Sequence, residues 1–352
     1  MRYNALYKTK PETEQKSAAL PVIKSQPQDK AVLWGGNKIH KFKYNTSSME
    51  RIGESWEIFP INDYIPGKEK ADAATSAKGM KPEELKNKFL DELLGASVRK
   101  AFGDNFPLLI KFIDATDKLS IQVHPNDELA HKRHKSPGKT EMWYVIEAED
   151  GAFVHVGFNK SIDKDEFRRR VEDNTLEEVL KRHPAKAGDV FFVPAGQVHG
   201  IGSGCLIAEI QQASDITYRI YDYGRKDADG NTRELHLEDA LNAIDFNADF
   251  DSGQKYELKG GVIAALVKCR YFNTNIIQVS KEYHRDAREL DSFIVYICIG
   301  GQFEISYNNV PKVEARKGEV ILIPASAGNV IIRPLNGEVK LIETYVPINT
   351  GK

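Results

Sequence analysis

The sequence predicts a mainly β protein made of two related barrel domains, with a few helices placed in or around the first. Short apolar runs recur along the chain and are broken by Gly, Pro, Asn and Asp, which is typical of sandwiches and barrels. One of these runs is repeated later in the chain. Helical periodicity is confined to a few stretches, so strands account for most of the order.

The expected strands and helices follow from these periods. The strands are PLLIKFID (107–114), LSIQVHP (119–125), MWYVIEAE (142–149), DVFFVPA (189–195), LIAEIQQ (206–212), SFIVYICI (292–299) and EVILIPA (319–325). The helices are 85–102, with Leu at 90, 93 and 94, then 163–182, starting near Asp163, and a shorter one at 236–244.

The repeat sets the domain division. AGDVFFVPA (187–195) is echoed by KGEVILIPA (317–325), and each copy is followed by a further apolar run. The polar, turn-rich segment 246–256 marks the boundary, which gives domains 1–250 and 251–352. Five residues after the Pro, the first copy has His199 and the second has Asn329. We therefore expect the first domain to be catalytic and the second to lack a metal site.

Composition excludes several classes of protein. The chain has 352 residues, 41% of them apolar and 28% charged, and its formal net charge is −2. This balance gives no general attraction to nucleic acid or anionic membranes. The three cysteines are widely spaced, which argues against disulfides or a cysteine zinc site. With no signal-peptide pattern and no spanning apolar stretch, we expect a soluble, cytoplasmic protein.

Four residues predict a metal site in the first domain. Gln122 and His124 are two positions apart on one strand, so both side chains lie on the same face. Glu141 precedes the next strand, and His199 follows PAGQV. Any one of them is an ordinary strand residue in most proteins. Together they supply nitrogen and oxygen ligands suited to Zn²⁺ and tolerable for Mn²⁺, Fe²⁺ or Co²⁺.

At these residues the sequence resembles the cupin-fold, zinc-dependent type I mannose-6-phosphate isomerases, in their short bacterial form. The matching motifs, in family order, are WGG (34–36), GESWEIF (53–59), FPLLIKFIDA (106–115), LSIQVHPND (119–127), GKTEMWYV (138–145), VPAGQVHGIG (193–202) and SDITYRIYDYGR (214–225). The resemblance implies two cupin-like (jelly-roll) barrels, one Zn²⁺ per chain and the interconversion of mannose 6-phosphate and fructose 6-phosphate.

The resemblance also assigns site residues. It implies metal ligands at Gln122, His124, Glu141 and His199, catalytic roles for Arg219, Glu209 and Lys139, and substrate contacts from Lys111, Asp215, Arg225, Trp34 and Glu54. Ser120 is a further candidate, with Lys111 and Arg225, for the phosphate. A family Tyr is often found where this chain has Ile201, which offers no hydroxyl.

The reaction moves a proton between two carbons through an enediol. A divalent metal polarises the neighbouring carbonyl, and a general base must reach the carbon. We favour Glu209 as this base, with Lys139 and then His199 as competitors. Arg219 is permanently charged and suits the stabilisation of developing negative charge.

Two alternatives remain open from the sequence. Two His and one carboxylate could hold Fe²⁺ in a cupin oxygenase, and a non-catalytic sugar-binding cupin could keep the same barrel. We expect a sugar-phosphate substrate, no nucleic-acid or membrane partner, and a monomer or weak homodimer.

Overall fold

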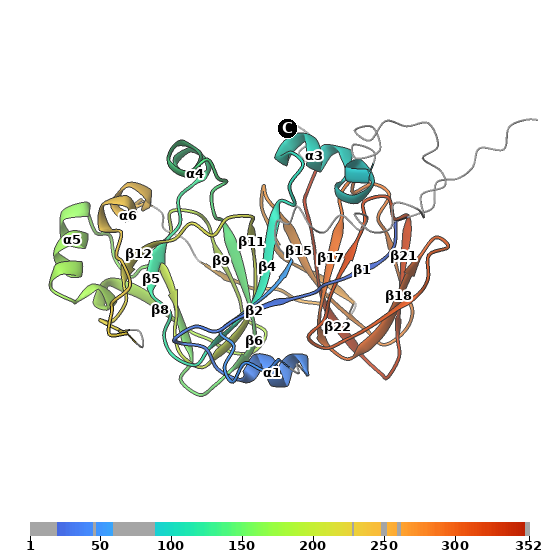
Figure 1. The fold of residues 1–352 in the computed structure, drawn as a ribbon, viewed down its shortest axis with the longest axis horizontal. Helices are drawn as coiled ribbons and strands as arrows, with labels where there is room; N and C mark the ends of the chain where they lie inside the picture. Colours follow the sequence, from blue (N-terminus) through green and yellow to red (C-terminus); the bar gives the residue numbers. More distant parts are fainter. Residues whose placement is uncertain are drawn as a thin grey trace, which may run out of the picture.

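The computed structural model describes residues 20–44, 47–58, 89–226, 229–247, 252–258 and 262–348. Two β barrels lie side by side, and each is built from two antiparallel sheets (Figure 1). The prediction of a mainly β fold with two barrels is therefore confirmed.

The first barrel has a seven-stranded and a five-stranded sheet. In sheet order, the larger one is β13 (Gly253–Gln254), β9 (Val190–Val193), β6 (Glu141–Ala148), β11 (Cys205–Gln212), β4 (Leu108–Ala115), β3 (Glu54–Ile58) and β2 (Gln28–Lys30). The smaller one is β12 (Tyr218–Tyr221), β5 (Ile121–Val123), β10 (His199–Ile201), β7 (Phe153–Phe158) and β8 (Leu180–Pro184).

The second barrel has a six-stranded and a four-stranded sheet. The larger one is β1 (Ile23–Lys24), β20 (Val320–Ile323), β17 (Ile294–Gly300), β22 (Val339–Tyr345), β15 (Asn273–Val279) and β14 (Ile263–Lys268). The smaller one is β16 (Tyr283–Asp286), β21 (Asn329–Pro334), β18 (Gln302–Tyr307) and β19 (Val313–Arg316).

The two barrels share one strand order. Strands β9-β6-β11-β4 correspond to β20-β17-β22-β15, and β5-β10-β7-β8 correspond to β16-β21-β18-β19. The repeated sequence segments therefore fall on the equivalent strands β9 and β20, and His199 and Asn329 both begin the strand that follows. The internal repeat is a repeat of structure.

The large sheets of the barrels pack against each other through their outer faces. Leu108, Ile110 and Phe112 of β4 share one buried cluster with Ile276 of β15 and Ile342 of β22. The intervening side chains of β4 point into the first barrel, and those of β15 and β22 point into the second. Because both faces are covered, strands such as β4 and β11 are buried along their whole length. This explains why they appear in the sequence as nearly continuous apolar runs.

The helices lie at the ends and edges of the barrels (Figure 1). They are α1 (Lys38–Lys43), the helical residues 89–94, α3 (Ala96–Phe102), α4 (Asp127–His134), α5 (Lys164–Glu172), the 3₁₀ turn η2 (Leu176–Val179) and α6 (Leu237–Ala243). Among these described helices, none is both long and apolar enough to cross a bilayer. The helix expected at 236–244 is confirmed as α6.

Two helix predictions need correction. The helix expected over 85–102 is interrupted at Gly95, which has φ +95, and residues 85–88 of that prediction lie outside the described residues. The helix expected over 163–182 begins as predicted, with the Asp163 side chain accepting from the Glu166 amide. It ends at Glu172, because Asn174 has φ +56, and residues 180–184 pair instead with β7 as strand β8.

Two short strands pair across the predicted division at residue 250. β1 comes from the N-terminal part of the chain but pairs with β20 of the second barrel. β13 lies beyond the division but pairs with β9 of the first barrel. The chain thus ties the barrels together at two edges, while the division into 1–250 and 251–352 stays a prediction.

Candidate metal centre and its cavity

Three potential metal ligands converge inside the first barrel. His124 follows β5, Glu141 begins β6 and His199 begins β10. One ligand atom from each lies within 4.8 Å of the others, and all three residues are buried. The two imidazole Nε2 atoms are 3.2 Å apart, and they lie 3.4 and 3.5 Å from the oxygens of Glu141. The barrel has brought together side chains that are far apart in the sequence.

Backbone contacts fix the orientation of both imidazoles. His124 Nδ1 lies 2.8 Å from the Ile216 carbonyl, and His199 Nδ1 lies 2.8 Å from the Gln197 carbonyl. A carbonyl oxygen only accepts, so each Nδ1 carries the proton and each Nε2 presents a lone pair to the cluster. Metal-binding histidines in proteins are oriented in this way.

The protonation states of the two histidines and of Glu141 favour the binding of a cation. Burial and the nearby Lys139 ammonium lower the pKa of His124 to about 3, and burial lowers the pKa of His199. Burial opposes ionisation of Glu141, but Lys139 and the two imidazoles hold its pKa well below the ordinary value. Neutral imidazoles and an ionised carboxylate are the forms that bind a metal.

The contacts of Glu141 test whether a metal fits this cluster. Its Oε1 atom is buried and has no hydrogen-bond partner among the described residues, while Oε2 is ion-paired with Lys139. The Lys139 ammonium also lies 3.0 Å from His124 Nε2. The lone pairs of the three ligands therefore already face one cation, the Lys139 ammonium. The Oε1 atom of Glu141 is still free to bind a metal cation. This donor set fits a divalent metal ion.

Gln122 lies beside the imidazoles. It is directly opposite His199 on β10 and opposite Arg219 on β12. Its amide nitrogen is 3.4 Å from His124 Nε2 and 3.3 Å from His199 Nε2, and its oxygen accepts from Ser120 Oγ over 3.2 Å. A half-turn of the planar amide would direct the oxygen toward the cluster, where it could serve as a fourth ligand.

Glu209, on β11, has both carboxylate oxygens in contact with a donor. Trp143 Nε1 donates to Oε1 over 2.9 Å, and Lys111 Nζ is 2.9 Å from Oε2. These contacts follow from strand register, because Glu209 lies opposite Trp143 on β6 and Lys111 on β4. Burial and the charge of Glu141 raise the pKa of Glu209, while Lys111 opposes this. A buried carboxylate with increased proton affinity is a candidate general base.

Lys111 is shared between two carboxylates. Its ammonium is 2.9 Å from Glu209 and 3.6 Å from Glu54. Burial alone would lower the pKa of Lys111, but these two carboxylates raise it above the ordinary value. Glu54 in turn accepts from Trp56 Nε1 over 2.7 Å. The charge of Lys111 is therefore neutralised inside the protein.

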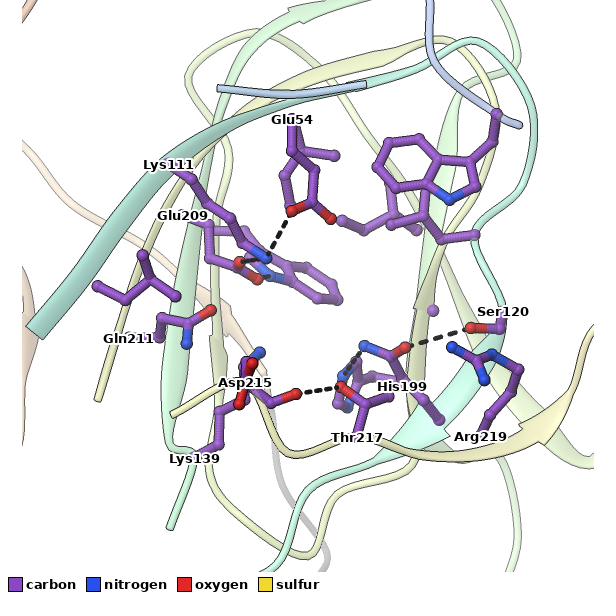
Figure 2. Close-up of a pocket in the computed structure, with 18 of the residues that line it drawn as sticks. Glu54, Lys111, Ser120, Lys139, His199, Glu209, Gln211, Asp215, Thr217 and Arg219 are labelled. Atoms are coloured by element: carbon purple, nitrogen blue, oxygen red, sulfur yellow. Dashed lines mark hydrogen bonds and ion pairs between the residues drawn. The ribbon is translucent and has the colours of Figure 1, made fainter. Parts of the chain in front are cut away.

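The cluster borders a cavity of about 160 Å³. Among the residues singled out in the sequence, those that line it are Trp34, Glu54, Lys111, Ser120, Gln122, Lys139, His199, Glu209, Asp215 and Arg219 (Figure 2). His124 and Glu141 lie behind this surface, 1% and 0% exposed. Ile201 also lines the cavity, so an apolar side chain occupies the position where a family Tyr was in question.

Arg225 is absent from the cavity lining. Its guanidinium is bonded to Asp222 and to the Lys118 carbonyl. Arg219 does face the cavity (Figure 2). Its Nη1 donates to the Glu234 carbonyl over 3.0 Å. Burial and the positive charge of Arg233 lower the pKa of Arg219.

Several lining residues were not singled out from the sequence. Trp143 and Gln211 line the cavity, and each is two positions from a predicted site residue on the same strand. Strand alternation could have identified both. Arg233 also lines the cavity, but it lies beyond β12 in a segment without regular alternation. Nothing local in the sequence predicts that its side chain reaches the site.

Comparisons with known proteins found related sequences and a similar fold. The family model described as "Phosphomannose isomerase type I, catalytic domain" matches residues 22–152. A mannose-6-phosphate isomerase from Streptococcus mutans is 33% identical over 85% of this chain and 91% of its own length. The mannose-6-phosphate isomerase ManA from Bacillus subtilis is 32% identical over 86% of this chain and 93% of its own. A crystal structure of the mannose 6-phosphate isomerase from Bacillus subtilis superposes with a TM-score of 0.75 and 28% identity, covering 92% of this chain and 99% of that one.

Proposed function

This chain belongs to the type I phosphomannose isomerase family, and from that premise we propose that the cavity of the first barrel is its active site. The protein is an aldose–ketose isomerase that interconverts mannose 6-phosphate and fructose 6-phosphate. The observation that supports this proposal is the inward-facing cluster of His124, Glu141 and His199 beside a polar cavity.

Gln122, His124, Glu141 and His199 would hold one Zn²⁺ per chain. Two imidazole nitrogens, a carboxylate and an amide oxygen suit Zn²⁺, and Mn²⁺, Fe²⁺ or Co²⁺ would fit the same donors. When bound, the ion supplies Lewis-acid polarisation of the sugar carbonyl. The two backbone carbonyls that accept from the imidazoles keep the ring orientations fixed before substrate arrives.

Glu209 is the proposed general base. In the direction from aldose to ketose it removes the proton from C2 of the sugar, and an enediol forms as the carbonyl oxygen gains a proton. The protonated Glu209 then delivers its proton to C1 while the C2 hydroxyl loses its proton and becomes the carbonyl, so the proton gained by O1 is balanced by the proton lost from O2. Its raised pKa favours this exchange, and Lys111 and Trp143 hold the carboxylate in place.

Lys139 is the competing candidate for proton transfer. It lines the cavity and its ammonium contacts both His124 and Glu141. An ammonium held between two such groups is better placed to donate a proton to a sugar oxygen than to remove one from carbon. His199 ranks behind it, since its Nε2 is committed to the cluster.

Arg219 would stabilise the negative charge that develops on the sugar oxygens. The remaining substrate contacts would come from Trp34, Glu54, Lys111, Ser120 and Asp215, all in the cavity wall, with Arg225 nearby. The polar character of this wall supports a sugar phosphate as substrate. We further propose a cytoplasmic enzyme, monomeric or weakly dimeric, with no nucleic-acid or membrane partner.

A coupled assay of mannose 6-phosphate conversion, run with and without a chelator, tests this function. We expect turnover that is lost after chelation and returns with Zn²⁺. Activity that resists complete metal removal would contradict the metal-dependent mechanism. The family membership disfavours the two alternatives, and the same preparation can exclude them directly. An Fe²⁺ oxygenase would consume O₂, whereas a sugar-binding cupin would bind without converting the sugar.

A further inference from the structure

Among the described residues, four cationic side chains line the cavity, and two of them are already held by other groups of the site. These four are Lys111, Lys139, Arg219 and Arg233. Lys111 is paired with Glu209 and Glu54, and Lys139 is paired with Glu141. The charge of Lys111 is thus matched by two carboxylates, and Lys139 lies against the proposed metal ligands, at the reacting end of the sugar. The Lys111 end of the cavity is therefore a poor place for a phosphate.

The two arginines are different. Among the described residues no carboxylate is ion-paired with Arg219, and its guanidinium donates only to the Glu234 carbonyl. Its Nε atom is buried with no hydrogen-bond partner there. Arg233 is paired with Asp222, but that carboxylate is shared with a third guanidinium, from Arg225. This end of the cavity carries an excess of positive charge.

Asp222 holds Arg233 and Arg225 together. It is 5% exposed, and its Oδ2 accepts from Arg233 Nε over 2.8 Å. Its Oδ1 accepts from Nη2 of both arginines. Arg225 also lies 3.8 Å from Asp117, whose side chain is exposed to water. One buried carboxylate between two guanidiniums fixes their planes but cannot neutralise both.

We propose that Arg233 binds the phosphate of the substrate, that Arg219 adds positive charge beside it while its guanidinium faces the sugar oxygens, and that Asp222 is the positioning residue that holds Arg233 in the cavity wall. This inference rests on the proposed function and names the phosphate end of that same cavity. A phosphate monoester carries close to two negative charges at neutral pH and is well matched by a guanidinium, which donates in a fixed fork.

Steady-state kinetics of an Arg233→Ala variant tests the proposal. We expect KM for mannose 6-phosphate to rise about 10- to 100-fold, the scale of a lost charge-assisted hydrogen bond, while kcat changes less than about threefold. Inorganic phosphate serves as a second probe, because its inhibition constant should rise in parallel. Arg233→Lys should reverse part of the rise in both constants, because lysine keeps the positive charge but lacks the planar set of donors of a guanidinium.

Asp222→Asn tests the positioning role with Arg233 still present. The same shift in KM and in the phosphate inhibition constant is expected, with kcat changed much less. A change in thermal stability alone, with both constants unaltered, would show that Asp222 is merely structural.

Two further variants serve as controls. Arg168→Ala removes an exposed arginine on α5 that pairs with Glu238, and it should leave both constants unchanged. Lys30→Ala removes the ammonium that lies 3.0 Å from the Trp56 ring centroid, next to the Lys111 end. If Lys30→Ala raises both constants and Arg233→Ala leaves them within twofold, the phosphate lies at the other end and the proposal is wrong. If the wild-type protein does not convert mannose 6-phosphate at all, the proposed function fails instead.

Discussion

Glu209 and Glu343 occupy equivalent positions in the two barrels and are held by the same pattern of contacts. Glu209 on β11 lies opposite Trp143, and Glu343 on β22 lies opposite Tyr296. Trp143 donates to Oε1 of Glu209 over 2.9 Å, and Tyr296 donates to Oε1 of Glu343 over 3.0 Å. The duplicated barrel has thus kept a buried glutamate together with its aromatic donor.

The second carboxylate oxygen shows the same correspondence. Lys111 is 2.9 Å from Oε2 of Glu209, and Asn275, from the equivalent strand, donates to Oε2 of Glu343 over 2.8 Å. The barrels differ in what fills the remaining space. In the second, Arg285 also donates to Glu343 over 2.9 Å, and the glutamate is 0% exposed. In the first, Glu209 lines the cavity.

The equivalence of the two glutamates gives a matched pair of variants. Glu209→Gln should lower kcat by about 100-fold or more, because it removes the proposed base. Glu343→Gln should leave kcat within about twofold and lower the free energy of unfolding by roughly 2–3 kcal/mol, since Arg285 loses its buried partner. Steady-state kinetics and urea unfolding measure the two effects. Equal losses of kcat in both variants would show that the glutamate acts only through the fold.

Gln122→Leu should weaken metal retention. Leucine fills a similar volume but offers no ligand atom, and removal of a group at the cluster is expected to lower metal affinity about 10- to 100-fold. Elemental analysis after dialysis against a weak chelator measures the metal left per chain. Metal content equal to that of the wild-type protein would remove Gln122 from the ligand set.

Arg219→Ala should retain the metal and lose turnover. The guanidinium lies opposite Gln122 in the sheet but donates away from the imidazoles, to the Glu234 carbonyl. We expect kcat to fall about 100-fold or more, the scale of a lost charge-stabilising donor. The same elemental analysis serves as the control, because full metal loss in this variant would mean that its role has been misassigned.

Gly35→Ala should destabilise the protein. A Cβ atom at this position would lie 2.6 Å from the backbone nitrogen of Gly53 and 2.7 Å from its Cα. Because these are backbone atoms, the chain carrying Trp34 must move away from the chain carrying Glu54. We expect a loss of roughly 1–3 kcal/mol, seen as a lower midpoint in thermal unfolding. Gly300→Ala is the matched control, since its added Cβ would be an ordinary 3.6 Å from Lys340; an equal loss in both would contradict the steric explanation.

Much of the fold could be predicted because the signals for it are local. Strand alternation placed Gln122 and His124 on one face, and the repeated segment before His199 and Asn329 indicated two related barrels. The prediction of helix at residues 180–182 was wrong for a physical reason. An apolar residue such as Leu180 fits a helical period as well as a strand, and only pairing with Phe158 decides between them. The helix α4 was also missed, although the side chain of Asn126 caps it.

Local sequence patterns were enough to predict the main buried strands, the duplication and the residue types able to bind a metal, because each depends on neighbours within a few positions. The family resemblance added the substrate. Tertiary structure alone decided which side chains meet. Closure of the first barrel brings Glu141 and His199 to His124, strand register gives Glu209 its two donors, and the packing of a distant loop carries Arg233 into the cavity. Such contacts join residues far apart in sequence, so no local period can encode them.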